Sequence, residues 1–186
     1  DYAPVGMAVD TVVYFTSNRK GNMGGIVDGF GEIIPDVYVS SKLDTSWTKA
    51  KNPGININSE LYDVSTGMNT NGDKLLIYKE GGDNSGDIFI SQLKGKSWQK
   101  AELADPSLAT KTFETGACIS NDGKKIFFAA NMKGTLGGKD IYMIVDRSGS
   151  MQGQRDKVIS GFNEYIDTIR QEPKTDITVV MFPGYP

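Results

Sequence analysis

Short runs of apolar residues, many of them alternating with polar ones, recur along the chain at a nearly constant spacing. The runs DVYV, DIFI and DIYM begin at Asp36, Asp87 and Asp140, so successive copies are 51 and 53 residues apart. Stretches rich in Asn, Asp and Gly separate the runs, a pattern typical of β-strands joined by tight turns. A period of this length indicates a repeat architecture.

Two further sets of residues follow the same period. A tryptophan comes eleven residues after each of the first two aspartates, at Trp47 and Trp98. A glycine turn precedes the second and third aspartates, and its glycines, Gly72 and Gly123, are also 51 residues apart. We expect the aspartates to accept hydrogen bonds from turn amides and the tryptophans to fill gaps between repeat units. These residues, Asp36, Asp87, Asp140, Trp47, Trp98, Gly72 and Gly123, are therefore predicted to be structural.

Each repeat unit predicts about four short antiparallel strands, the size of one propeller blade. The predicted fold is mainly β, a partial β-propeller of about three four-stranded blades at residues 10–54, 60–106 and 112–144, within a repeat region at 1–144. The first blade carries an inserted loop at residues 26–35. A closed propeller usually has four to eight blades. Missing blades would come from a longer chain, of which this sequence is a fragment or splice, or from another copy; the sequence favours the former.

Residues 121–142, with the sequence NDGKKIFFAANMKGTLGGKDIY, resemble the TolB/WD-like β-propeller repeats of OmpA-associated cell-envelope proteins. The similarity is strongest in the third unit, good in the second and partial in the first. It implies a periplasmic, outer-membrane-associated or extracellular protein. It also implies a non-enzymatic binding or scaffold module whose propeller loops engage an envelope or surface protein, or a glycan such as peptidoglycan.

The repeat pattern changes after Asp140, because the tryptophan expected at position 151 is a methionine. An apolar strand instead leads into Asp146, Ser148 and Ser150, followed by an amphipathic helical pattern and a second apolar strand. Residues 141–186 thus predict a short β-α-β segment that resembles the N-terminal part of a von Willebrand factor A domain.

The resemblance implies that Asp146, Ser148 and Ser150 begin a metal-ion-dependent adhesion site (MIDAS). One carboxylate and two hydroxyls are hard oxygen ligands that suit Mg²⁺ or Ca²⁺. The family adds a threonine and an aspartate from later loops, so the site is incomplete in this sequence. Capping of the following helix is the alternative role of the two serines. Divalent-cation-dependent adhesion is accordingly the alternative function.

Composition removes several other functions. Histidine is absent, which excludes Ser-His-Asp and Cys-His catalysis and the usual zinc sites within this chain. A net charge of −3 with scattered basic residues argues against a nucleic-acid partner. No apolar run is long enough for a membrane span.

We therefore expect no enzyme activity. A role as a glycosidase or peptidase accessory domain is the third alternative, since two placed carboxylates suffice for glycoside hydrolysis. The single cysteine, Cys118, lies in an apolar run and is predicted to be buried in a strand.

Overall fold

The computed structural model describes residues 1–6, 11–81, 85–106, 114–121, 123–130 and 140–145. These residues form three antiparallel β-sheets, and the elements assigned among them include one short 3-10 helix, η1 (Met23–Gly25). The prediction of a mainly β fold made of several antiparallel sheets is confirmed. Of the predicted β-α-β segment only the first strand is described, and residues 146–186 lie outside the described ranges.

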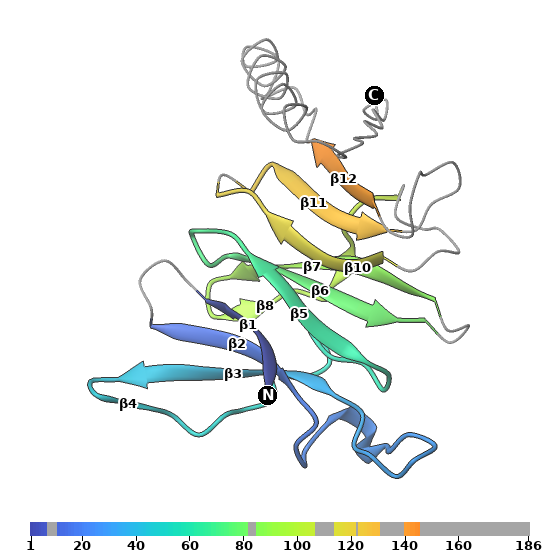
Figure 1. Ribbon diagram of the computed structural model, residues 1–186. Helices are drawn as coiled ribbons and strands as arrows, with labels where there is room; N and C mark the ends of the chain where they lie inside the picture. Colours follow the sequence, from blue (N-terminus) through green and yellow to red (C-terminus); the bar gives the residue numbers. More distant parts are fainter. Residues whose placement is uncertain (7–10, 82–84, 107–113, 122, 131–139, 146–186) are drawn as a thin grey trace, which may run out of the picture.

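The three sheets follow one another in chain order, from the lower to the upper part of Figure 1. The first contains, in spatial order, β1 (Tyr2–Gly6), β2 (Val12–Ser17), β3 (Asp36–Leu43) and β4 (Ser46–Trp47). The second contains β5 (Asp63–Met68), β6 (Lys74–Glu80), β7 (Gly86–Lys94) and β8 (Ser97–Trp98), with β9 (Glu102–Leu103) also paired to β7. The third contains β10 (Glu114–Ile119), β11 (Lys125–Ala130) and β12 (Asp140–Val145).

The strand pairing repeats from sheet to sheet in the same register. In the first sheet Val39 bridges Lys51. In the second, Ile90 pairs with Glu102, and each of these residues comes 51 positions after its counterpart. The strand pairing therefore repeats with the same 51-residue period as the sequence. The first sheet also includes β1, which precedes the predicted blade start at residue 10.

A separate apolar core fills each seam between neighbouring sheets. The core between the first and second sheets contains Tyr14, Val37, Ile57, Leu75, Ile77, Trp98 and Ala101. The core between the second and third contains Leu76, Ile88, Ala117, Ile119, Ile126, Phe128 and Ala130. Successive residues of β6 enter opposite cores, which explains its continuous apolar run: a strand buried on both faces has no polar side.

The first strands of the three sheets, β1, β5 and β10, lie next to one another, and we call them the innermost strands. Each of them carries one register irregularity. It falls between Tyr2 and Val5, between Ser65 and Gly67, and between Thr115 and Ala117. At the second of these, a side chain on Gly67 would bring a Cβ to 3.1 Å from the Ala117 carbonyl oxygen. Glycine therefore permits the close approach of β5 to β10.

The burial predicted for Cys118 is wrong, because the structure leaves this residue exposed. Its neighbours in β10, Ala117 and Ile119, are buried against the second sheet. Since side chains alternate along a strand, Cys118 points to the opposite side of the third sheet. The apolar run around it was a sound strand signal, but it did not reveal which face has a neighbour.

Candidate functional site

The aspartates and glycines of the repeat occupy corresponding places in the sheets. Asp36 begins β3, Asp87 is the second residue of β7 and Asp140 begins β12. Gly72 and Gly123 lie in the turns before β6 and β11 and have φ angles of +71° and +70°. This left-handed conformation disfavours residues with a Cβ, which accounts for glycine at both positions.

The two tryptophans occupy equivalent strand positions but have different surroundings. Trp98 ends β8, is 9% exposed, and donates a hydrogen bond from Nε1 to the Tyr14 hydroxyl at 2.9 Å. The two rings meet edge to face, with centroids 5.7 Å apart. Trp47 ends β4 and is 49% exposed. One tryptophan therefore fills a seam, as the sequence predicted, and the other does not within the described residues.

Asp36 belongs to a buried polar network at the first seam. Its Oδ2 accepts hydrogen bonds from the Met23 amide at 2.7 Å and from the Asn52 side chain at 2.6 Å. Asn52 in turn accepts a hydrogen bond from Asn58, whose side chain bonds both backbone polar groups of Val37. Burial raises the pKa of the Asp36 carboxyl, and the two hydrogen bonds offset this effect only in part.

A second buried carboxylate, Asp63, completes this network. Lys79 forms an ion pair with Asp63 and donates to the Ile57 carbonyl at 2.6 Å. Ser59 donates a further hydrogen bond to Asp63 from its hydroxyl at 2.9 Å. Asp63 is fully buried, so the network connects the start of the second sheet to the loop before it and is closed to any substrate.

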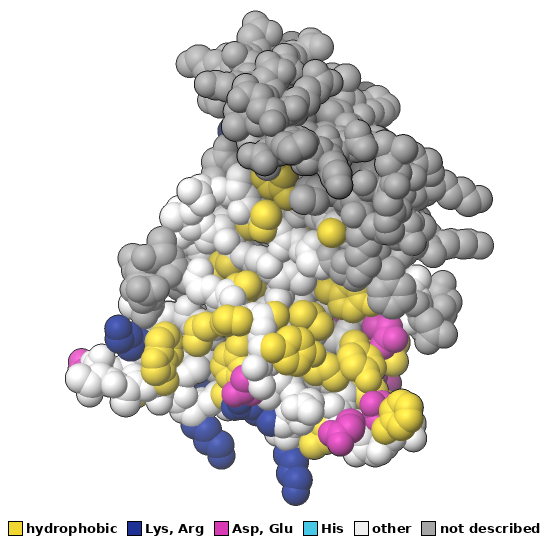
Figure 2. Space-filling view, viewed as in Figure 1, with side chains coloured by type: hydrophobic (Ala, Val, Ile, Leu, Met, Phe, Trp, Pro, Cys, Tyr) yellow, Lys and Arg dark blue, Asp and Glu magenta, His cyan; other side chains and the backbone are white. Residues whose placement is uncertain are grey.

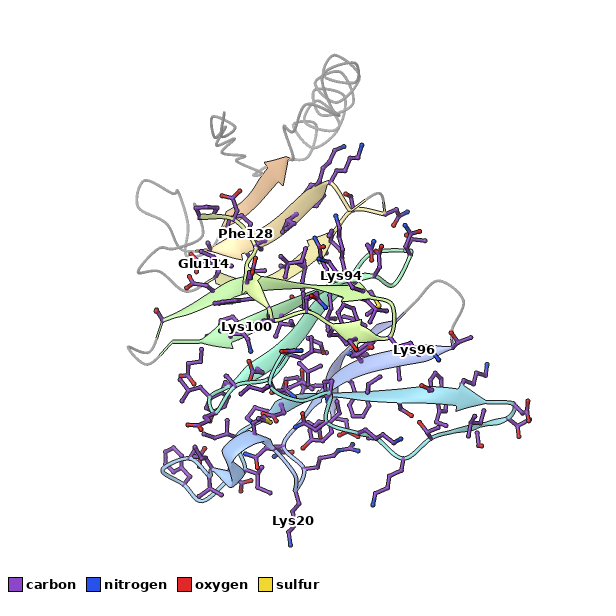
Figure 3. The ribbon with its side chains drawn as sticks, turned by 180° about the vertical axis from the view of Figure 1, so that it is seen from behind. Lys20, Lys94, Lys96, Lys100, Glu114 and Phe128 are labelled. Atoms are coloured by element: carbon purple, nitrogen blue, oxygen red, sulfur yellow. The ribbon has the colours of Figure 1, made fainter. Side chains whose placement is uncertain are left out.

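Sequence reasoning missed Asp63 and its counterpart Glu114, although the signal was present. The two residues are 51 positions apart, begin β5 and β10, and are both fully buried. Glu114 and Phe128 lie where the third sheet meets the second (Figure 3). A buried acid at the start of each of these two innermost strands is thus a further element of the repeat.

The predicted metal ligands Asp146, Ser148 and Ser150 lie outside the described residues. Binding of Mg²⁺ or Ca²⁺ there stays a prediction. Within the ranges that the structure describes, no group of three or more Cys, Asp or Glu side chains is placed to hold a metal ion.

The inserted loop at residues 26–35 forms a small protruding hairpin, at the lower right of Figure 1. Val27 and Ile33 pair as an isolated bridge, and the Ile34 amide donates to the Ile26 carbonyl at 3.3 Å. At the tip of this 26–35 hairpin, the Phe30 side chain is 96% exposed. A large apolar residue held in water is an unusual feature of a monomer surface when other apolar residues lie beside it.

Asp28 organises the tip of the 26–35 hairpin. Its Oδ1 accepts hydrogen bonds from the amides of Phe30 and Glu32, each at 2.9 Å. These backbone hydrogen bonds lower the pKa of the Asp28 carboxyl, that from Glu32 most strongly. Asp28 therefore stays ionised at neutral pH while it fixes the turn that displays Phe30.

A hollow of about 310 Å³ lies beside the 26–35 hairpin. Its walls come from β1, the loop after β2, the hairpin and the segment before β5, through Tyr2, Asn18, Asp28, Glu32, Ile33, Pro35 and Tyr62. The Tyr62 hydroxyl lies 3.4 Å from Asp28 Oδ2, to which it donates. In Figure 2 hydrophobic side chains form a band across the lower half of this face, and acidic side chains border its right-hand end.

The charged side chains that line the hollow are all acidic. Two carboxylates, Asp28 and Glu32, are among its lining residues, and no lysine or arginine is. Lys20, which precedes the hairpin, extends away from the body of the molecule (Figure 3). Aromatic walls with carboxylates at the rim suit a cationic side chain whose stem is apolar, since the rings and the acids both attract the cation.

Repeated antiparallel sheets that bury their faces against one another define a β-propeller type of fold. Among solved structures, the chain is similar to TolB from Acinetobacter baumannii, with a TM-score of 0.51 and 19% sequence identity. The match covers 79% of this chain and 30% of that TolB chain, so this chain spans under a third of its length. No family model and no curated protein matches the sequence.

Proposed function

We propose that this chain is part of a non-enzymatic, protein-binding module of the bacterial cell envelope, and that the 26–35 hairpin and its hollow contact the partner. The observation that carries the proposal is the 96% exposure of Phe30 at the tip of a turn fixed by Asp28. An ordered apolar tip loses little conformational freedom on binding, and buried aromatic residues are frequent anchors of protein interfaces.

The envelope assignment rests on the fold and on the repeat sequence. The fold is similar to that of TolB, and residues 121–142 resemble the repeats of TolB and of OmpA-associated envelope proteins. In the described residues no helix is long and apolar enough to cross a membrane.

A non-enzymatic role is supported by the surroundings of the acidic side chains. Asp36 and Asp63, the carboxylates with raised pKa values, are 1% and 0% exposed. Glycoside hydrolysis needs two carboxyl groups that reach the sugar from opposite sides. These two sealed carboxylates cannot do this, and the chain has no histidine to serve as a general base. Of the two acids that line the hollow, Asp28 accepts hydrogen bonds at both carboxylate oxygens and has a lowered pKa, which disfavours it as a proton donor.

The chemistry of the hollow favours a particular partner surface. We expect a protein segment that presents an arginine or lysine next to an apolar residue. The cation would lie near Asp28 and Glu32, and the apolar residue would contact Phe30. Because the carboxylates attract the cation through solvent, raised salt should weaken this association.

The test is capture of envelope proteins from the producing organism by immobilised chain, with two variants in parallel. Phe30→Ala removes the exposed tip, whereas Leu43→Ala removes a side chain that is 59% exposed on another hairpin. We expect a captured protein whose affinity, measured with the purified pair, falls about tenfold or more for Phe30→Ala and stays unchanged for Leu43→Ala.

Equal affinity of all three proteins would contradict the proposed site. Binding to purified peptidoglycan, measured by co-sedimentation and lost in Phe30→Ala, would replace the protein partner with a glycan. Turnover of a glycoside or peptide substrate by the purified chain would overturn the non-enzymatic assignment.

A further inference from the structure

The side of the first sheet that faces away from the second is an apolar face with no neighbouring sheet in the described residues. Val13 and Phe15 point to this side, because they alternate in β2 with the buried Tyr14 and Thr16. Trp47 lies on the same side and is 49% exposed. We call these three residues, Val13, Phe15 and Trp47, the Trp47 face.

Arg19 covers one part of the Trp47 face. Its guanidinium lies 4.9 Å from the centre of the Phe15 ring and 5.2 Å from that of Tyr38. Asp1 holds the guanidinium in place through an ion pair at 2.6 Å. On the Trp47 face, the large apolar side chain that stays exposed to water is therefore Trp47.

The second sheet shows what normally covers such a face. Trp98 comes 51 residues after Trp47 and stands at the same position of its sheet, where Leu93 pairs with it as Lys42 pairs with Trp47. The first sheet buries Trp98 by placing Tyr14 against it. By the repeat, the Trp47 face fits the side of a blade that presents an aromatic ring at the Tyr14 position.

The third sheet carries such a ring on its outer side. Phe127 corresponds to Tyr14, since Phe127 pairs with Met143 where Tyr14 pairs with Val39. It alternates in β11 with Ile126 and Phe128, which are buried against the second sheet, so it points the other way. The exposed Cys118 pairs directly with Phe127 and shares its side. We call this pair, Phe127 and Cys118, the Phe127 face.

We propose that two copies of this chain associate head to tail, with the Trp47 face of each copy packed on the Phe127 face of the other. Two sets of the three sheets that the described residues form would make six blades, which is within the range of four to eight that closed propellers use. Head-to-tail contacts either close into a ring or grow into filaments, and here two contacts close the ring. The inference does not depend on the partner of the 26–35 hairpin.

The new contact should be weaker than the seam that it copies. Phenylalanine offers no hydroxyl, so the hydrogen bond that Trp98 makes to Tyr14 has no equivalent at Trp47. Association also costs translational and rotational freedom that a covalently linked blade does not lose. We therefore expect dimers that dissociate at roughly micromolar concentration.

Sedimentation velocity over a range of concentrations tests the proposal. The unmodified chain is expected to shift from one mass to twice that mass as its concentration rises. Trp47→Ala should weaken the dimer at least tenfold, whereas Leu43→Ala, on the opposite side of the same hairpin, should leave it unchanged. Circular dichroism and thermal unfolding of both variants check that each is folded.

The native cysteine gives a second readout. Cys118 should react with a maleimide more slowly at concentrations where the dimer forms, and Trp47→Ala should restore the fast reaction. A monomer at every concentration would overturn the proposal, as would a dimer indifferent to Trp47→Ala or one that leaves Cys118 equally reactive. Phe30→Ala separates the two proposals, because it should abolish partner binding and keep the dimer.

Discussion

Trp98 and Trp47 are the same residue at the same place of two successive sheets, yet one is 9% and the other 49% exposed. Trp98 lies in the seam between the first two sheets, against Tyr14. Trp47 lies on the outer side of the first sheet, where the described residues place no sheet. The two positions have the same strand pairing and similar flanking residues, SWTK and SWQK, although Trp47 pairs with Lys42 and Trp98 with Leu93. The larger difference is that Trp98 has a neighbouring sheet against it, whereas the described residues place none against Trp47.

This comparison shows that a blade is not a unit of stability by itself. Each sheet forms its hydrogen bonds internally, but it buries its apolar faces only against the next sheet. Stability in such a chain is approximately the sum of small internal contributions and large contributions from neighbouring interfaces. Mutations should therefore be costly in seams and mild on outer faces.

The largest expected difference is between the two tryptophans themselves. Trp98→Ala should lower the free energy of unfolding by about 4 kcal/mol, because it leaves a cavity in the first core and removes the hydrogen bond to Tyr14. Trp47→Ala, compared at concentrations where the chain is monomeric, should cost less than about 1 kcal/mol. Urea unfolding followed by circular dichroism measures both, and equal losses would contradict the comparison.

Ion pairs should show the same division. Asp63→Asn leaves the Lys79 ammonium buried in the seam without its counter-charge, so we expect a loss of about 3 kcal/mol. Asp1→Asn breaks the exposed pair with Arg19 and should cost less than about 1 kcal/mol. Added salt should leave the loss of stability in Asp63→Asn nearly unchanged, because this pair is shielded from solvent. A surface-like cost for Asp63→Asn would show that water reaches this pair.

The stability cost of replacing a turn glycine should not depend on how many sheets lie beside the turn. Gly72 and Gly123 have nearly the same positive φ, so alanine at either position should cost about 1 kcal/mol through backbone strain. Asparagine should cost less, because it tolerates the left-handed region better. Chemical unfolding of the four variants checks this, and a much larger cost at one turn would reveal a packing role for that glycine.

The smallest expected effect is the pH dependence of Asp36. Since burial raises its pKa, the folded state binds this proton more tightly than the unfolded state. The resulting stabilisation is complete below the ordinary value of 3.8 and is lost as pH rises through the raised pKa. Asp36→Asn should therefore gain stability relative to the unmodified chain as pH rises from about 4 toward neutral. A difference that is constant over this range would refute the assignment.

Much of the fold was predictable because short sequence patterns specify its strands and turns. The alternation of apolar residues and the glycine turns predicted the strands. The period of 51 matched Trp98 with Trp47 and Asp87 with Asp36, and each pair occupies corresponding points of the first two sheets. The first strand was missed, since Tyr2-Ala3-Pro4 lacks the apolar alternation of the other strands.

The remaining features could not be read from local patterns. The exposure of Trp47 and Cys118 depends on which sheets surround them, and no alternation of residues encodes the presence of a neighbour. The 26–35 hairpin was recognisable as an insertion, but the two backbone hydrogen bonds that Asp28 accepts, which fix the turn that displays Phe30, are a property of one particular turn.

The irregularity in the innermost strands has a geometric consequence. An extra residue in one strand of a pair bends and twists it locally, and at Gly67 the missing side chain lets β5 come close to β10. A larger residue at position 67 would push β10 away from β5. The small size of Gly67 therefore limits the spacing, and with it the angle, between the second and third sheets.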